Sequence, residues 1–105
     1  MKRKVAVVRF TKPRESVRDV IEMAGGIGKI DPGLRVFIKP NIVFWTKETD
    51  FPKWGVITTS RVVEDVVVYL KEVGIQRIII GEGIVTSRPK DYETPKHAFE
   101  YLGYN

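Results

Sequence analysis

The chain contains no cysteine among its 105 residues. This absence excludes disulfides, thiolate zinc sites, cysteine nucleophiles and any iron–sulfur cluster held by this chain alone. No apolar run approaches the roughly 20 residues that a membrane helix needs, and Met1-Lys2-Arg3-Lys4 leads into an apolar stretch too short for a secretory signal. We therefore expect a cytoplasmic protein that has no membrane partner.

Recognisable catalytic motifs are also missing. The sequence contains no Gly-x-Ser-x-Gly turn, no phosphate-binding loop ending in Gly-Lys-Ser/Thr and no His-Glu-x-x-His pair. His97 is the one histidine, and no cluster of further ligands accompanies it, so we predict no metal site. Without a complete set of acid, base and nucleophile, catalysis by this chain alone is not favoured, and its cofactor is left undefined.

Asn and Gln are rare, whereas Lys, Arg, Glu, Ile and Val are frequent, a bias that resembles proteins of heat-loving organisms. Hydrophobic residues make up 43% and charged residues 30%, which indicates a folded chain. The length suits one α/β domain over residues 1–105, or the N-terminal portion of a larger domain. The net charge is +5, but no positive run exceeds three residues, so nucleic-acid binding is not favoured.

Three short runs of apolar and β-branched residues predict strands at Val5–Phe10, Leu34–Lys39 and Gln76–Gly81. Pro40 closes the second run, because proline cannot donate to a ladder of hydrogen bonds. Helical segments separate the runs, so the strands are expected to be parallel.

Two helices are predicted from caps and from apolar residues at helical spacing. Ser16 is a suitable N-cap for the first, and Gly25-Gly26 ends it. The second is capped by Thr58, Thr59 or Ser60 and ends at Gly74. Its polar side is expected to contain Glu64, Asp65, Lys71 and Glu72.

A short third helix is expected from Thr94, with Pro95 in its first turn, to Gly103. The complete order is then βαβαβα, an open parallel sheet in two or three layers that corresponds to a Rossmann-like or flavodoxin-like half. Three strands leave an edge of the sheet open, which a partner chain or a further part of the domain would cover.

Polar residues and glycines follow the second and third predicted strands, where ligands of open α/β sheets usually bind. We expect an anionic ligand there, with Lys39 as a point charge, Asn41 as an oriented donor and the start of the second helix as a source of free N–H groups. The alternative is that these residues only end a strand, cap a helix or form a tight turn. The candidate ligand residues are Lys39, Asn41, Thr58, Thr59, Gly81, Glu82 and Gly83.

A long segment from Ile42 to Ile57 has no clear periodicity and carries four large aromatic residues. They can form a lid over the ligand, contact a partner, or fold back on the edge of the sheet as local core. These residues are Phe44, Trp45, Phe51 and Trp54.

Several of these features together resemble one family. The run Arg35-Val-Phe-Ile-Lys-Pro-Asn41, the pair Thr58-Thr59, the helix from Val62 to Gly74 and the run from Ile78 to Gly83 are similar to the N-terminal portion of the family of domains of unknown function numbered 362. The resemblance spans residues 5 to about 103. It implies an α/β fold and a candidate pocket, in a family whose longer members sometimes accompany ferredoxin-like iron–sulfur modules.

Two functions therefore stay open for this chain. The first is an α/β domain that holds a small anionic molecule at the carboxyl ends of its strands. The second is an interaction module without chemistry of its own, completed by self-association into a homo-oligomer or by a partner chain.

Overall fold

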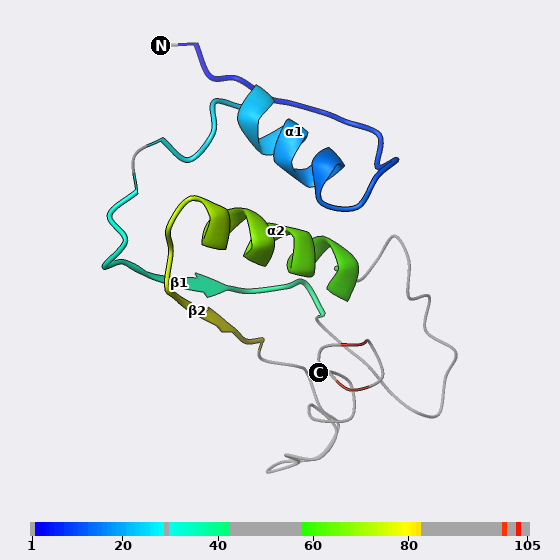
Figure 1. The fold of residues 1–105 in the computed structure, drawn as a ribbon. Coiled ribbons are helices and arrows are strands. Elements are labelled where there is room, and N and C mark those ends of the chain that lie inside the picture. The colour runs from blue at the N-terminus through cyan, green and yellow to red at the C-terminus, as the bar shows by residue number, and fades with distance from the viewer. Residues whose placement is uncertain (1, 29, 43–57, 83–99, 101–102, 104–105) are drawn as a thin grey trace. The chain divides into compact units, whose positions relative to one another are not determined.

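The computed structural model of the chain describes residues 2–28, 30–42, 58–82, 100 and 103. In these residues the order of elements is α1 (Glu15–Met23), β1 (Arg35–Ile38), α2 (Ser60–Glu72) and β2 (Arg77–Ile80), as Figure 1 shows. The two strands pair in one parallel sheet, and α2 is the connection between them. The described part is therefore an α/β structure. It divides into two compact units, residues 1–36 with 61–79 and residues 37–60 with 80–105.

Both strands of the sheet lie inside the runs that the sequence predicts, and each is one residue shorter at either end. Beyond the end of β2, the N–H of Gly81 still donates to the carbonyl of Ile38 at 3.0 Å. The ladder of hydrogen bonds therefore continues to the point where the two chain segments turn away from the sheet.

The structure differs from the sequence prediction at Val5–Phe10, to which it assigns no strand. Val5 and Val7 are 89% and 88% exposed. Within the described residues, no backbone hydrogen bond involves residues 2–10. A β-branched run becomes a strand only when a neighbouring strand pairs with it and covers its apolar side. Among the residues that the structure describes, no strand pairs with this run.

The start of α1 is a tight, strained turn rather than a serine cap. Arg14 precedes the helix with φ 65° and ψ −53°, and the N–H of Glu15 donates to the carbonyl of Pro13 at 2.7 Å. These dihedral angles, together with a hydrogen bond from the N–H of residue i+2 to the carbonyl of residue i, define a γ-turn of the rare type with positive φ. Ser16, the predicted cap, instead lies in the first turn of the helix, where its Oγ accepts the N–H groups of Thr11 and Lys12 at 3.0 Å.

The glycines end both helices as the sequence predicts. At the end of α1, Gly26 donates to Ile21 at 2.8 Å and Gly25 donates to Glu22 at 3.0 Å. At the end of α2, Ile75 donates to Leu70 at 3.0 Å and Gly74 donates to Lys71 at 3.1 Å. Each pair of bonds forms a Schellman motif. Gly25 and Gly74 have φ of 116° and 105°, values that side chains disfavour, so glycine is required at these two turns.

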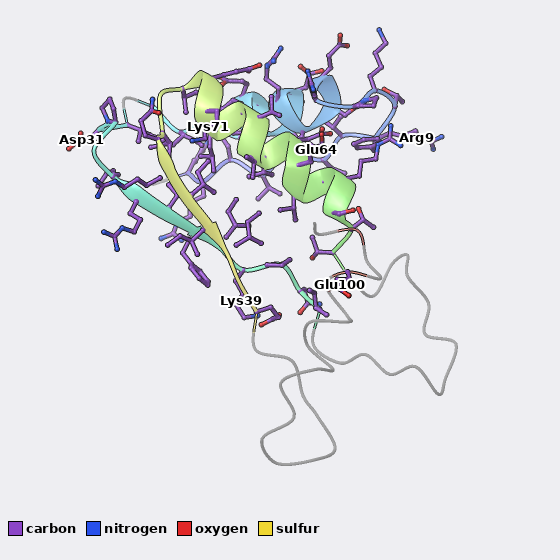
Figure 2. The ribbon with its side chains drawn as sticks, turned by 60° about the horizontal axis from the view of Figure 1, so that its bottom comes forward. Arg9, Asp31, Lys39, Glu64, Lys71 and Glu100 are labelled. Carbon is purple, nitrogen blue, oxygen red and sulfur yellow. The ribbon has the colours of Figure 1, made fainter. Side chains whose placement is uncertain are left out.

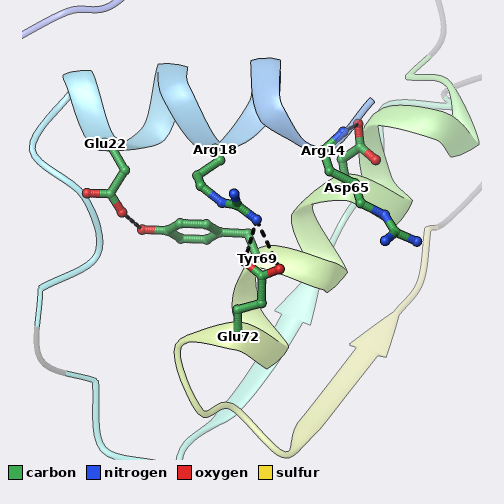
Figure 3. Close-up of polar contacts among 6 residues, drawn as sticks. All are labelled: Arg14, Arg18, Glu22, Asp65, Tyr69 and Glu72. Carbon is green, nitrogen blue, oxygen red and sulfur yellow. Dashed lines mark hydrogen bonds and ion pairs between the residues drawn. The ribbon is translucent and has the colours of Figure 1, made fainter. Parts of the chain in front are cut away.

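Within the first unit, α1 and α2 are joined by polar contacts, which Figure 3 shows. The guanidinium of Arg18 donates to both carboxylate oxygens of Glu72, at 3.0 and 2.8 Å. The hydroxyl of Tyr69 donates to Glu22, and the pKa of Tyr69 is raised mainly by this bond and then by burial. The apolar residues buried in this unit are Val17, Val63, Tyr69, Leu70 and Ile75.

The structure corrects the prediction that Asp65 lies on the exposed polar side of α2. The sequence pattern places it outward with Glu64, but Asp65 is only 4% exposed, and its Oδ2 accepts the backbone N–H of Arg14 at 2.8 Å. The carboxylate therefore connects α2 to the turn that begins α1 (Figure 3). Several other predictions lie outside the described residues, among them the loop with its four aromatic residues, Gly83, His97 and the start of the helix at Thr94.

Candidate functional site

The carboxyl ends of the two parallel strands place two polar segments at one edge of the sheet. Lys39, Pro40 and Asn41 follow β1, and Gly81 and Glu82 follow β2. Figure 2 shows Lys39 where the strands end. Thr58 and Thr59 come directly before the first residue of α2 in the chain. All of these residues belong to the second compact unit.

The centre of the edge is the buried carboxylate of Glu82, whose side chain is 3% exposed. Its Oε2 accepts a hydrogen bond from the Nζ of Lys39 at 2.9 Å and another from the backbone N–H of Ile42 at 3.2 Å. Ile42 is itself fully buried. A buried carboxylate needs such charged and N–H donors, because leaving it without them would carry a large desolvation penalty. Glu82 therefore ties the segment after β1 to the end of β2.

Lys39 has the opposite exposure. Its side chain is 62% exposed although its Nζ contacts the buried carboxylate. An ammonium group has three donors, so one bond to Glu82 leaves further donor directions toward solvent. The contact holds a positive charge in a defined place at the edge of the sheet, and it also neutralises part of that charge.

Asn41 and Thr58 are joined by two hydrogen bonds, one of which uses the side chain of Thr58. The N–H of Asn41 donates to the Oγ1 of Thr58 at 3.0 Å, and the N–H of Thr58 donates to the carbonyl of Asn41 at 2.9 Å. These reciprocal bonds hold the segment after β1 against the residues that lead into α2. The Thr58 hydroxyl thus serves the backbone of Asn41, and Ser60 is the first residue of the helix.

Gly81 has a packing role at this edge. A Cβ added at Gly81 would lie 3.0 Å from Cζ and 3.2 Å from Cε2 of Phe37, so a side chain there would displace the phenyl ring. The glycine that the sequence suggested for close approach of a ligand thus also allows close approach of an aromatic ring.

The structure brings together Lys39 and Glu82 by one contact, and Asn41 and Thr58 by another. Thr59 is half-buried next to Thr58, and Gly83 lies outside the described residues. Sequence reasoning missed the backbone N–H of Ile42 as a partner of Glu82. A backbone donor is the same for every residue except proline, so no residue type signals it.

Metal ligation has no support at this edge. Among the described residues, no three His, Cys, Asp or Glu side chains gather in a group that could hold a metal ion. No helix in the described ranges is long and apolar enough to cross a membrane. Among the described residues at this edge, the charged groups are the exposed ammonium of Lys39 and the buried carboxylate of Glu82.

Comparison with known proteins identifies one family. The family model described as "Domain of unknown function (DUF362)" matches residues 36–105, which is about two thirds of the chain. The match begins within β1 and includes every residue of the candidate site, whereas the predicted resemblance began at residue 5. The chain matched no curated protein and no solved structure.

Proposed function

We propose that this chain, which belongs to the DUF362 family, binds a small anionic ligand at the carboxyl ends of β1 and β2. The single observation that carries the proposal is an exposed ammonium group, Lys39, held in place by a buried carboxylate, Glu82. A phosphate or carboxylate group would accept from Lys39 on its solvent side. Thr59, directly before α2, would supply an N–H donor, since the start of a helix favours negative charge.

Glu82 has two opposing effects on such a ligand. It fixes the ammonium in one place, which favours binding by reducing the loss of side-chain freedom. It also places a second negative charge 2.9 Å from the ammonium that the ligand must contact, and like charges repel. We expect the repulsion to be the larger effect, because Lys39 is anchored through a single atom and is otherwise exposed.

Nuclear magnetic resonance titration with inorganic phosphate tests this proposal through two variants that should change affinity in opposite directions. Lys39→Gln removes the ammonium, and we expect affinity to fall about tenfold, the value of one charge-assisted hydrogen bond. Glu82→Gln removes the competing charge while an amide oxygen can still accept from Ile42, and we expect affinity to rise by roughly threefold to tenfold. In the unmodified chain, phosphate should shift the amide signals of Asn41, Thr58 and Thr59.

Arg77→Gln is the matched control. It removes one exposed positive charge at the amino end of β2, whereas Glu82 follows the carboxyl end of that strand, and it should leave phosphate affinity within twofold. An equal loss for Arg77→Gln and Lys39→Gln would contradict a localised site. The same conclusion follows if phosphate, nucleotides and carboxylates all leave the three amide signals unchanged.

The second candidate function is self-association without chemistry. It is favoured by Phe37, a residue in β1 that is 62% exposed, on a sheet of two described strands. Burial of an exposed phenyl ring is favourable, so a second copy of the chain is the expected cover. Sedimentation analysis over a range of concentrations should then show a dimer that Phe37→Ser abolishes. Val7→Ser is the control, because Val7 is another exposed apolar residue but lies outside the sheet, and it should leave the dimer intact. A monomer at all concentrations would contradict this candidate.

Three further expectations stand beside this proposal. The sequence pattern predicts a Rossmann-like arrangement of the complete sheet and a cytoplasmic location, and the family resemblance implies an association with iron–sulfur proteins. Each stays a prediction, and the first would be checked by an experimental structure that includes residues 83–99.

A further inference from the structure

The positive charge of the chain is concentrated at its start. Residues 2–14, which we call the basic arm, contain six Lys and Arg residues and no Asp or Glu. From residue 15 onward there are 12 positive and 13 negative residues, so the rest of the chain has a formal charge of −1. The entire excess of +5 therefore comes from the basic arm. Its cationic residues are Lys2, Arg3, Lys4, Arg9, Lys12 and Arg14.

The structure leaves this charge available to a partner. All six cationic residues of the basic arm are exposed. Lys12 contacts Glu15 at 3.6 Å, and within the described part of the chain the other five side chains form no ion pair. By contrast, Arg18, four residues after the arm, is already paired with Glu72. Residues 2–10 also have backbone groups without backbone hydrogen bonds among the described residues, so they can follow the contour of a partner.

An aromatic platform lies at the end of the arm. Phe10 is 41% exposed, and the guanidinium carbon of Arg61, at the start of α2, lies 5.0 Å from the centre of its ring. Both residues belong to the first compact unit. A half-exposed ring stacked with a guanidinium group presents flat surfaces on which an unpaired base can stack.

We propose that the basic arm binds single-stranded nucleic acid, with its five unpaired cations on phosphates and with Phe10 and Arg61 against a base. Three of the five cations are Arg, whose planar fork suits phosphate oxygens. An anionic membrane is the less suitable partner. Peripheral membrane segments are amphipathic helices with large apolar residues on one face, whereas the arm is non-helical and its most exposed apolar residues are two valines. A long basic run is absent, which counted against nucleic acid in the sequence, but the arm places six cations and no anion within 13 residues.

The test is fluorescence anisotropy with a labelled oligothymidylate of about 20 nucleotides, longer than the roughly 4 to 16 that one small domain covers. Five phosphate contacts predict a slope of about −3.5 in log affinity against log salt, or an approximately 100-fold loss between 50 and 200 mM salt. Arg3→Gln/Arg9→Gln should reduce the slope to about −2.1 and the loss to about 20-fold. Phe10→Leu should weaken binding at every salt concentration without changing the slope.

Arg35→Gln/Arg77→Gln is the matched control, because it removes two exposed Arg charges at the amino ends of β1 and β2. It should leave affinity and slope unchanged, and the thermal unfolding of both double variants should match that of the unmodified chain. Three results would overturn the proposal: no binding at 50 mM salt, an equal effect of the control pair, or binding to vesicles of anionic lipid with none to the oligonucleotide. Tighter binding to a duplex of the same length would overturn the role given to Phe10 and Arg61.

Discussion

In each compact unit, a buried carboxylate among the described residues accepts a backbone N–H, and the two carboxylates differ in what else they contact. In the helix pair, Asp65 accepts the N–H of Arg14 at 2.8 Å, and no ion pair of Asp65 occurs among the described residues. At the strand ends, Glu82 accepts the N–H of Ile42 at 3.2 Å and also contacts the exposed ammonium of Lys39. The first carboxylate serves only the fold, whereas the second also fixes a charge that solvent can reach.

The exposure of the carboxylate's partner therefore distinguishes a structural polar residue from a candidate binding residue. A buried carboxylate with a backbone partner stabilises a turn and offers nothing to a ligand. A buried carboxylate with an exposed cationic partner holds that cation in a fixed position, where a ligand can contact it. The predictions below test whether Asp65 and Glu82 differ in this way.

Asp65→Ala should have the largest effect on stability. It removes the buried acceptor of the Arg14 N–H and releases Arg14, whose positive φ is held only by the surrounding contacts. We expect the free energy of unfolding to fall by about 2 to 3 kcal/mol, measured by urea denaturation. Glu64→Ala, the same truncation at the preceding exposed residue, should change it by less than about 0.5 kcal/mol. Equal effects of the two truncations would show that Asp65 is not a structural anchor.

The role of Asp65 also shows where sequence reasoning stopped. The glycines at residues 25, 26 and 74 predicted the ends of both helices, because a Schellman motif depends on local backbone conformation. The carboxyl ends of the strands were predicted within one residue. At β1 the reason is again local, since Pro40 has no N–H to donate to a ladder. Asp65 was predicted on the outer side of α2 because helical periodicity cannot register a polar partner 51 residues away. Val5–Phe10 failed in the same way, since a strand requires a distant partner that its own residues do not specify.

Glu82→Ala should have the next largest effect, and it should differ in kind. The loss of an acceptor for the buried N–H of Ile42 should lower the free energy of unfolding by about 1 to 2 kcal/mol. The released Lys39 is exposed and returns to water at little cost, which is why we expect a smaller loss than for Asp65→Ala. The amide of Asn41 should shift in the spectrum of Glu82→Ala, and no amide at the strand ends should shift in that of Asp65→Ala. A loss larger than that of Asp65→Ala would reverse the proposed ranking.

Arg14→Gly should change stability in the opposite direction. The dihedral angles of the γ-turn at Arg14 are unfavourable for any side chain and open to glycine. Part of the relief is offset by the greater freedom of glycine in the unfolded chain, so we expect a net gain of about 0.5 to 1 kcal/mol. Arg9→Gly makes the same replacement at a residue without positive φ and should bring no gain. A loss of stability in Arg14→Gly would mean that the arginine side chain contributes more than its backbone strain removes.

The smallest expected effect is confined to alkaline pH and concerns Tyr69, another donor to a carboxylate in the helix pair. The bond to Glu22, followed by burial and the charge of Glu22, raises the pKa of Tyr69 above its ordinary value of 10.0, with Arg18 opposing. A folded-state pKa above that of the unfolded chain means that this contribution to stability is complete below about pH 10 and is lost as pH rises through the folded value. The free energy of unfolding should therefore fall more steeply above pH 10 in the unmodified chain than in Tyr69→Phe, which has no phenol to ionise.

Glu22→Gln removes the negative partner and should give an intermediate slope, because burial still favours the neutral phenol. Identical slopes of the free energy of unfolding against pH in all three proteins would show that the helix pair does not require a neutral Tyr69. Tyr69 would then no longer contrast with Lys39, the charged donor to Glu82.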